Sequence, residues 1–70
     1  MTKEKALEFA TRKVNVHPDL FVVVKDGGSF GMLCAAKGNY LYTVEYDREF
    51  DLEPAVYITD FVNKRVERVY

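Results

Sequence analysis

With 70 residues, of which 49% are hydrophobic and 14% aromatic, the chain is one small folded domain rather than a disordered segment. Its formal net charge of −1 argues against a protein that coats nucleic acid, because such proteins usually need a strongly basic surface. A chain this short buries only about 60% of the surface that its unfolded form exposes. Pairing with a second copy, as a homodimer, is an expected remedy for so small a core.

The cysteine count and the N-terminal sequence predict a cellular location. The single cysteine, Cys34, cannot form an internal disulfide, whereas small secreted domains usually carry several. The first residues are charged, and the longest apolar run near them, 20–24, is far too short for a signal core or a membrane span. We therefore expect a cytoplasmic protein without an export signal or a membrane anchor.

Residues 2–14 have the pattern of an amphipathic helix. Thr2 is a suitable N-cap, and four apolar residues at helical spacing share one face: Ala6, Leu7, Ala10 and Val14. Pro18 favours an end to the helix within 15–18, because the residue before a proline avoids helical geometry.

From residue 20 onward the pattern predicts strands. Segments rich in β-branched and aromatic residues alternate with turn signals, and they lie at 20–25, 30–36, 40–46 and 55–59. Gly31 lies inside the second segment as a weak point or a bulge. The glycines of 27–31 lack the Lys-Ser/Thr of a phosphate-binding loop, so they predict a hairpin turn. The short connections favour an antiparallel sheet.

The last residues, 61–70, fit two structures. Val62, Val66, Val69 and Tyr70 fall on one helical face, but their β-branched and aromatic side chains favour extended structure. We predict a turn over 61–64 and a strand over 65–70, with a helix as the alternative. The expected fold is a single α+β domain over residues 1–70, in which an N-terminal amphipathic helix packs on one antiparallel sheet of four or five strands.

The segment 45–53, called the acidic segment below, is the feature that most indicates a function. It carries five acidic residues against one arginine, a formal charge of −4, while the other residues sum to +3. The acids occupy every second position: Glu45, Asp47, Glu49, Asp51 and Glu53. In an extended backbone these carboxylates would share one side. The opposite face would continue from Tyr40, Tyr42, Val44 and Tyr46 through Arg48, Phe50 and Leu52.

Such a row of carboxylates has several interpretations. The structural interpretation is a charged edge that keeps the strand soluble. The functional hypothesis is a docking surface for a basic protein. One form of this hypothesis is a mimic of nucleic acid or an inhibitor, because the spacing of about 6.8 Å between alternate carboxylates resembles the spacing between successive phosphates of a nucleic-acid strand. A calcium loop fails on spacing, since Leu52 and Ile58 stand where an EF-hand needs glycine and glutamate. A weak calcium contact outside such a loop stays open.

Catalytic and metal sites have little support in the sequence. Cys34 lies in an apolar run that predicts an inert core thiol, and the only histidine, His17, lies in a loop. One histidine and one cysteine make neither a zinc site nor a nucleophile with its base and orienting group. Solvated carboxylates on a strand are poor candidates for an acid–base pair. We predict no enzyme activity, no cofactor and no metal.

A second function hypothesis is a small nucleic-acid-binding protein. It would use the basic residues Lys64, Arg65 and Arg68 together with exposed tyrosines, since aromatic rings beside basic side chains form stacking surfaces for bases. An enzyme of unrecognised type is the third. The sequence therefore favours a non-catalytic protein-interaction module whose acidic segment meets a basic partner.

Overall fold

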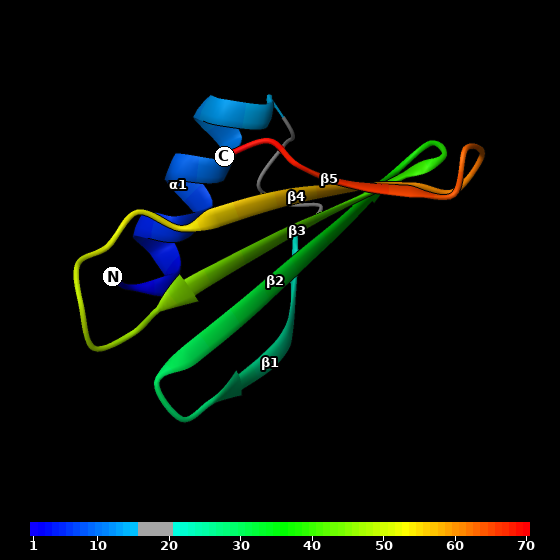
Figure 1. Cartoon of the computed structure of the whole chain (residues 1–70). Coiled ribbons are helices and arrows are strands. Elements are labelled where there is room, and N and C mark those ends of the chain that lie inside the picture. The colour runs from blue at the N-terminus through cyan, green and yellow to red at the C-terminus, as the bar shows by residue number, and fades with distance from the viewer. Residues whose placement is uncertain (16–20) are drawn as a thin grey trace.

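The computed structural model describes residues 1–15 and 21–70, with only the backbone of residues 25 and 26. One helix precedes a five-stranded antiparallel sheet whose strands follow in chain order (Figure 1). This confirms the predicted α+β fold, with five strands. The elements are α1 (Lys3–Val14), β1 (Val22–Gly27), β2 (Phe30–Lys37), β3 (Tyr40–Asp47), β4 (Ala55–Asp60) and β5 (Arg65–Arg68).

Helix α1 is closed by local contacts at both ends. The side chain of Thr2, the predicted N-cap, accepts a hydrogen bond of 3.3 Å from the N–H of Lys5. At the other end Asn15 adopts the left-handed conformation with φ 55°, and its N–H donates to the carbonyl of Thr11. The helix thus ends at Val14, and the rest of the predicted end, 16–18, lies outside the described residues.

The end of the chain forms a hairpin, as predicted, and not a helix. Residues 61–64 make the turn between β4 and β5, with Lys64 in the left-handed region at φ 53°. Asp60 holds the turn, because its carboxylate accepts the N–H groups of Val62 and Asn63 at 3.0 and 3.2 Å. The Asn63 amide adds a bond of 2.8 Å. These hydrogen bonds, with Arg65 nearby, lower the pKa of Asp60 below its ordinary value of 3.8.

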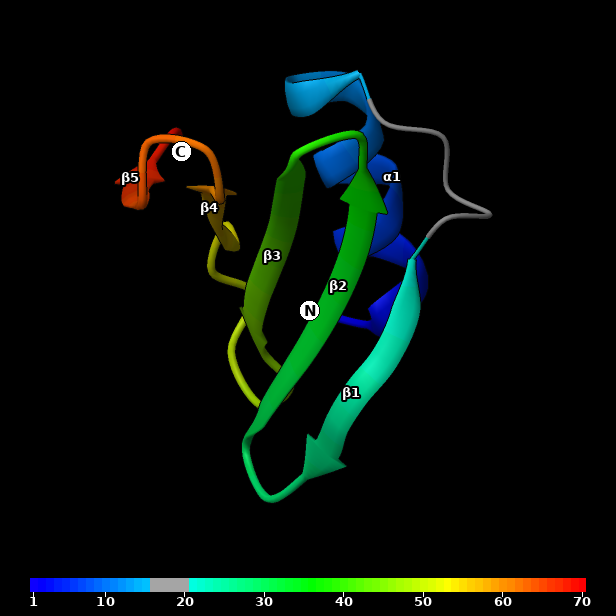
Figure 2. The ribbon, with the colours of Figure 1, turned by 90° about the vertical axis from the view of Figure 1, so that its right-hand side faces the viewer.

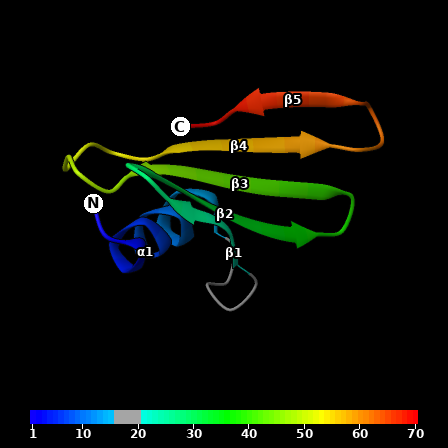
Figure 3. The ribbon, with the colours of Figure 1, turned by 90° about the horizontal axis from the view of Figure 1, so that it is seen from below.

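The core lies between α1 and one face of the sheet. Ala6 and Ala10 are fully buried, and such small side chains let the helix approach the strands closely. The sheet contributes Leu33, Val44 and Val56, which are all at most 1% exposed. Figure 3 shows that the hairpin turns at 38–39 and 61–64 extend past the helix, so α1 covers one end of this face.

Gly31 is explained by a packing contact and not by a bulge. The β2–β3 register runs without a shift, and Gly31 pairs with Tyr46. A Cβ at position 31 would overlap the Tyr46 ring, which is 2% exposed beneath α1. The irregularity that the sequence suggested at Gly31 lies instead in β1, where the register shifts between Val23 and Lys25.

The tyrosine face of β3 is only partly core. Val44 and Tyr46 are buried as predicted, whereas Tyr40 is 44% exposed at the end of the sheet that α1 does not reach. The predicted continuation of this face is wrong, because β3 ends at Asp47. Phe50 and Leu52 beyond it are both 60% exposed.

Candidate functional site

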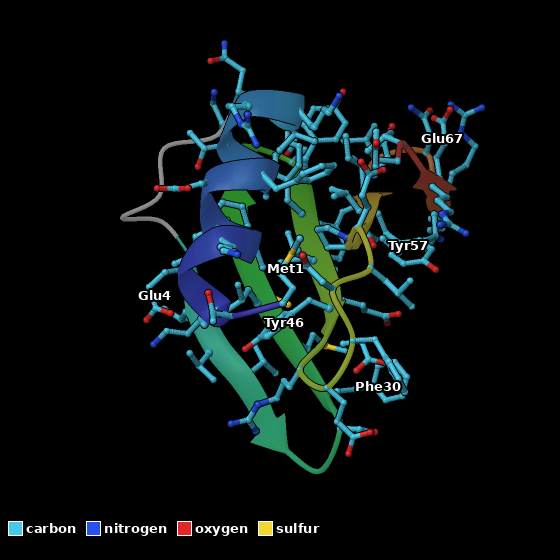
Figure 4. All side chains as sticks on the ribbon, turned by 90° about the vertical axis from the view of Figure 1, so that its left-hand side faces the viewer. Met1, Glu4, Phe30, Tyr46, Tyr57 and Glu67 are labelled. Carbon is cyan, nitrogen blue, oxygen red and sulfur yellow. The ribbon has the colours of Figure 1, made fainter. Side chains whose placement is uncertain are left out.

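The sheet face opposite α1 has no covering layer among the described elements. Figure 2 looks onto this face, with α1 behind β1, β2 and β3 and no element in front of them. Figure 4 shows Tyr46 beside the helix, while Phe30 and Tyr57 project clear of it. We call this surface the open face. The strand registers place on it Val22, Phe30, Met32, Cys34, Ala36, Leu41, Thr43, Ala55, Tyr57, Thr59 and Val66, together with three charged residues, Glu45, Asp47 and Arg68.

The open face is mostly apolar and in part strongly exposed. Phe30, Val22 and Val66 are 60, 62 and 69% exposed. From Phe30 to Ala36 the face spans about 20 Å along β2, and Val22 of β1 and Val66 of β5 extend it toward the two edges of the sheet. Contiguous exposed apolar surface on single proteins is commonly functional.

Cys34 corrects one prediction about this face. The thiol is half-buried on the open face and not in the core, and its Sγ lies 3.7 Å from the Thr43 hydroxyl. His17, which the sequence places in a loop, lies outside the described residues.

The sequence of β2 carries a signal for the open face. Residues 30–36 are apolar at both odd and even positions, with no alternation of polar side chains. A continuous apolar strand is typical of one that is covered on both faces. Because α1 covers only one of them, the other was the place to expect a second covering layer.

The acidic segment does not form the extended row that its alternation predicted. Only Glu45 and Asp47 lie in β3, and the chain bends over residues 48–50 before β4 begins. Asp47 causes the bend, because its carboxylate accepts the N–H groups of Glu49 and Phe50 at 2.8 and 3.2 Å. The N-terminal ammonium group of Met1 donates to the carbonyls of Asp47 and Phe50 at 2.8 and 2.7 Å.

Glu53 joins the acidic segment to the end of the chain. It accepts a hydrogen bond from the hydroxyl of Tyr70, and this bond raises the pKa of Tyr70 above its ordinary value of 10.0, with burial as a smaller cause. The Tyr70 ring meets Phe9 of α1 edge to face at 4.7 Å, and the ammonium of Lys13 lies 4.9 Å from the Tyr70 ring centre. Glu53 therefore helps to hold Tyr70, and with it the end of the chain, against α1.

Four carboxylates of the acidic segment have exposed side chains, and only Asp47 is half-buried. Glu53 is held by Tyr70, which leaves Glu45, Glu49 and Asp51 for a partner. Glu45 pairs with Met32 on one side and Ala55 on the other, so it lies on the open face itself. Glu49 and Asp51 follow in the connection after β3, whose Phe50 carbonyl is bonded to the Met1 ammonium in front of α1. The structure thus places one exposed carboxylate on the open face and two more in the connection at the end of β3.

The basic residues of the nucleic-acid hypothesis do not form one surface. Lys64 closes the hairpin turn, and Arg65 lies on the helix side of the sheet opposite Asp60. Arg68 lies on the other side, and its Nε donates to the carbonyl of Tyr70 at 2.8 Å. Tyr40 and Tyr57 are likewise on opposite faces, and each has one basic residue on its own side, since Tyr57 pairs with Arg68 and Tyr40 shares a hollow with Arg65. The aromatic and basic side chains are therefore divided between the two faces.

Other chemistry finds no centre in the residues described. None of their His, Cys, Asp and Glu side chains form a group of three that could hold a metal ion. In the same residues, no helix has the length and apolar content of a membrane span. One open hollow of about 410 Å³ is lined by Leu7, Glu8, Thr11 and Arg12 of α1.

No protein-family model, curated protein or solved structure matches this chain.

Proposed function

We propose that the protein is a non-catalytic protein-interaction domain that binds a basic partner through the open face and the acidic segment beside it. The observation that carries this proposal is the uncovered apolar face, on which Phe30, Val22 and Val66 are each at least 60% exposed. Leaving such a surface in water loses the stabilisation of about 25 cal/mol per Å² that burial would give. A bound partner supplies the missing layer.

The charges define the partner's chemistry. A partner that covers the open face brings apolar side chains to β2, β3 and β4. On that face it also meets Glu45, and a partner that reaches past the end of β3 meets Glu49 and Asp51, so lysine or arginine there gives charge complementarity. Because the acidic segment is extended only as far as Asp47, a general basic protein surface fits better than a groove shaped for phosphates. The half-buried thiol of Cys34 suits a reducing compartment, and we place the interaction in the cytoplasm.

A pull-down from cell lysate with the double variant Glu49→Lys, Asp51→Lys tests the role of charge. Both side chains are exposed, so reversal leaves the fold intact, whereas Asp47 has to be kept because it holds the bend. We expect proteins captured by the wild type to be basic and to be lost from the variant and at high salt. Mass spectrometry identifies the captured proteins, and circular dichroism checks the fold.

Glu4→Lys with Glu8→Lys is the matched control, since it makes the same charge change on exposed positions of α1. Phe30→Ser tests the apolar part of the surface and should also reduce capture. If the α1 variant loses the same proteins, general charge and not the acidic segment governs capture. Capture that survives both Phe30→Ser and the reversal at 49 and 51 would refute the proposal.

A further inference from the structure

Strand β5 leaves one edge of the sheet open. It is the last strand in the order, all four of its residues are exposed, and no described strand follows it (Figures 1 and 3). The opposite edge, β1, carries a register shift between Val23 and Lys25, and such irregularities protect an edge against pairing. Strand β5 is itself short and charged, which limits edge pairing, but its register with β4 runs without a shift. Its outer edge presents backbone N–H and C=O groups that another strand can bind.

The backbone hydrogen bonds show which residues of β5 face this edge. The N–H groups of Val69 and Tyr70 both donate to the carbonyl of Val56, at 2.8 and 3.2 Å. Because bonded pairs alternate along an antiparallel ladder, Arg65 and Glu67 also bond to β4. Val66 and Arg68 therefore direct their N–H and C=O groups away from the sheet. The Phe61 N–H donates to the Asn39 carbonyl at 3.1 Å, which lies on the β3 side of β4. The alternate residues of β4, including Val56 and Asp60, therefore bond toward β5.

The side chains of β5 select one self-pairing register. When two copies of β5 pair about a two-fold axis, the residue at the centre lies opposite itself in the other copy. A register centred on Glu67 or on Arg68 therefore opposes two like charges, which is unfavourable. Centring on Val66 instead opposes Arg65 of each copy to Glu67 of the other, on the helix side of the sheet. It also lets Val66, whose backbone faces the edge, exchange both its hydrogen bonds with its copy.

We propose that β5 pairs antiparallel with β5 of a second copy in this Val66-centred register. The two sheets then form one continuous sheet, with both open faces on the same side and Val66 beside its copy. Val66, at 69% exposure, loses water contact there. The opposition of Lys64 and Arg68 at the ends of the pair is a cost, which their exposure to solvent limits.

The dimer goes beyond the proposed function, because it needs no partner protein and uses an edge that docking on the open face leaves unused. A paired strand of four residues buries little surface, so we expect a weak dimer that forms at high protein concentration. It would place two binding faces side by side, which favours a partner with two copies of the recognised surface.

Sedimentation equilibrium over a wide range of protein concentration tests the proposal. Val66→Pro removes an N–H that only the dimer uses, and proline is tolerated at such edge positions. We expect it to abolish dimerisation and to leave the β4–β5 hairpin intact in NMR spectra. Arg65→Glu should raise the dissociation constant about tenfold, because two attractive pairs become repulsive.

The double variant Arg65→Glu, Glu67→Arg separates the dimer contact from contacts within the chain. It restores opposite charges between the copies, but it keeps a glutamate opposite Asp60 within each chain. Recovery of the dimer in this variant supports the register. A wild type that stays monomeric at all concentrations, or a dimer that survives Val66→Pro, would overturn the proposal. A dimer lost only on Phe30→Ser would indicate pairing of the open faces instead.

Discussion

The contact between Gly31 and Tyr46 depends on the absence of one side chain. A methyl group at position 31 would overlap the Tyr46 ring, which has no room to move because it is 2% exposed under α1. We expect Gly31→Ala to lower the free energy of unfolding by about 1–3 kcal/mol, the usual cost of overpacking a core. Urea denaturation measures it. Gly27→Ala is the control, because open space surrounds that position. Equal losses in both variants would contradict the contact.

The bond from Tyr70 to Glu53 makes stability depend on alkaline pH. The folded state raises the pKa of Tyr70, so its contribution is complete below the ordinary value of 10.0 and is lost as the pH rises through the raised pKa. We expect the free energy of unfolding to decline above about pH 10. Denaturant titration at each pH measures this decline. Tyr70→Phe should be less stable at neutral pH and should show a smaller alkaline decline. An unchanged decline would assign the effect to other tyrosines.

At the scale of the elements, Asp60 makes the β4–β5 hairpin depend on one carboxylate. It accepts two backbone N–H groups of the turn and an amide of Asn63. We expect Asp60→Ala to speed amide exchange in β5 without affecting β2, as measured by NMR. The same loosening should appear in the wild type at acid pH, since a lowered pKa means that the contribution is lost as the pH falls through it. Asp51→Ala, in the exposed connection before β4, should leave the exchange of β5 unchanged.

Elements governed by local chemistry could be predicted from the sequence. Thr2 caps α1, glycine and asparagine make the turns, and β-branched residues make the strands, so their boundaries were close to those observed. The acidic segment could not be predicted from alternation alone, because the Asp47 carboxylate bonds to the N–H groups of Glu49 and Phe50 and bends the chain. Hydrophobic periodicity does not show such a competition between a side chain and the strand.

The part of the sheet that α1 covers could also not be predicted from the sequence pattern. A helix of 12 residues is about 18 Å long, whereas a strand of 8 residues extends about 27 Å, so α1 leaves part of its own face uncovered. This difference leaves Tyr40 exposed while Tyr46 is core. The apolar character of the open face is a related case, since counting elements does not show that one helix serves a sheet with two apolar faces.

For the whole molecule, the one-sided core means that a few side chains carry most of the stability. A chain of 70 residues has a free energy of unfolding of roughly 4–10 kcal/mol. Leu33, at 1% exposure between α1 and the sheet, has the environment in which leucine to alanine costs about 2–5 kcal/mol. We therefore expect Leu33→Ala to remove about half of the stability, as measured by urea denaturation.

Leu52→Ala makes the same chemical change at a position that is 60% exposed, so it should cost no more than about 0.5 kcal/mol. Phe30→Ala on the open face should be similarly mild in the isolated chain, because that side chain is also 60% exposed and no described element covers it. A large loss from Phe30→Ala would mean that the open face is already buried in solution. A partner that binds only the folded state stabilises it. If the loss of stability caused by Phe30→Ala is mild in the isolated chain and large when a partner is present, the open face contributes its energy to binding.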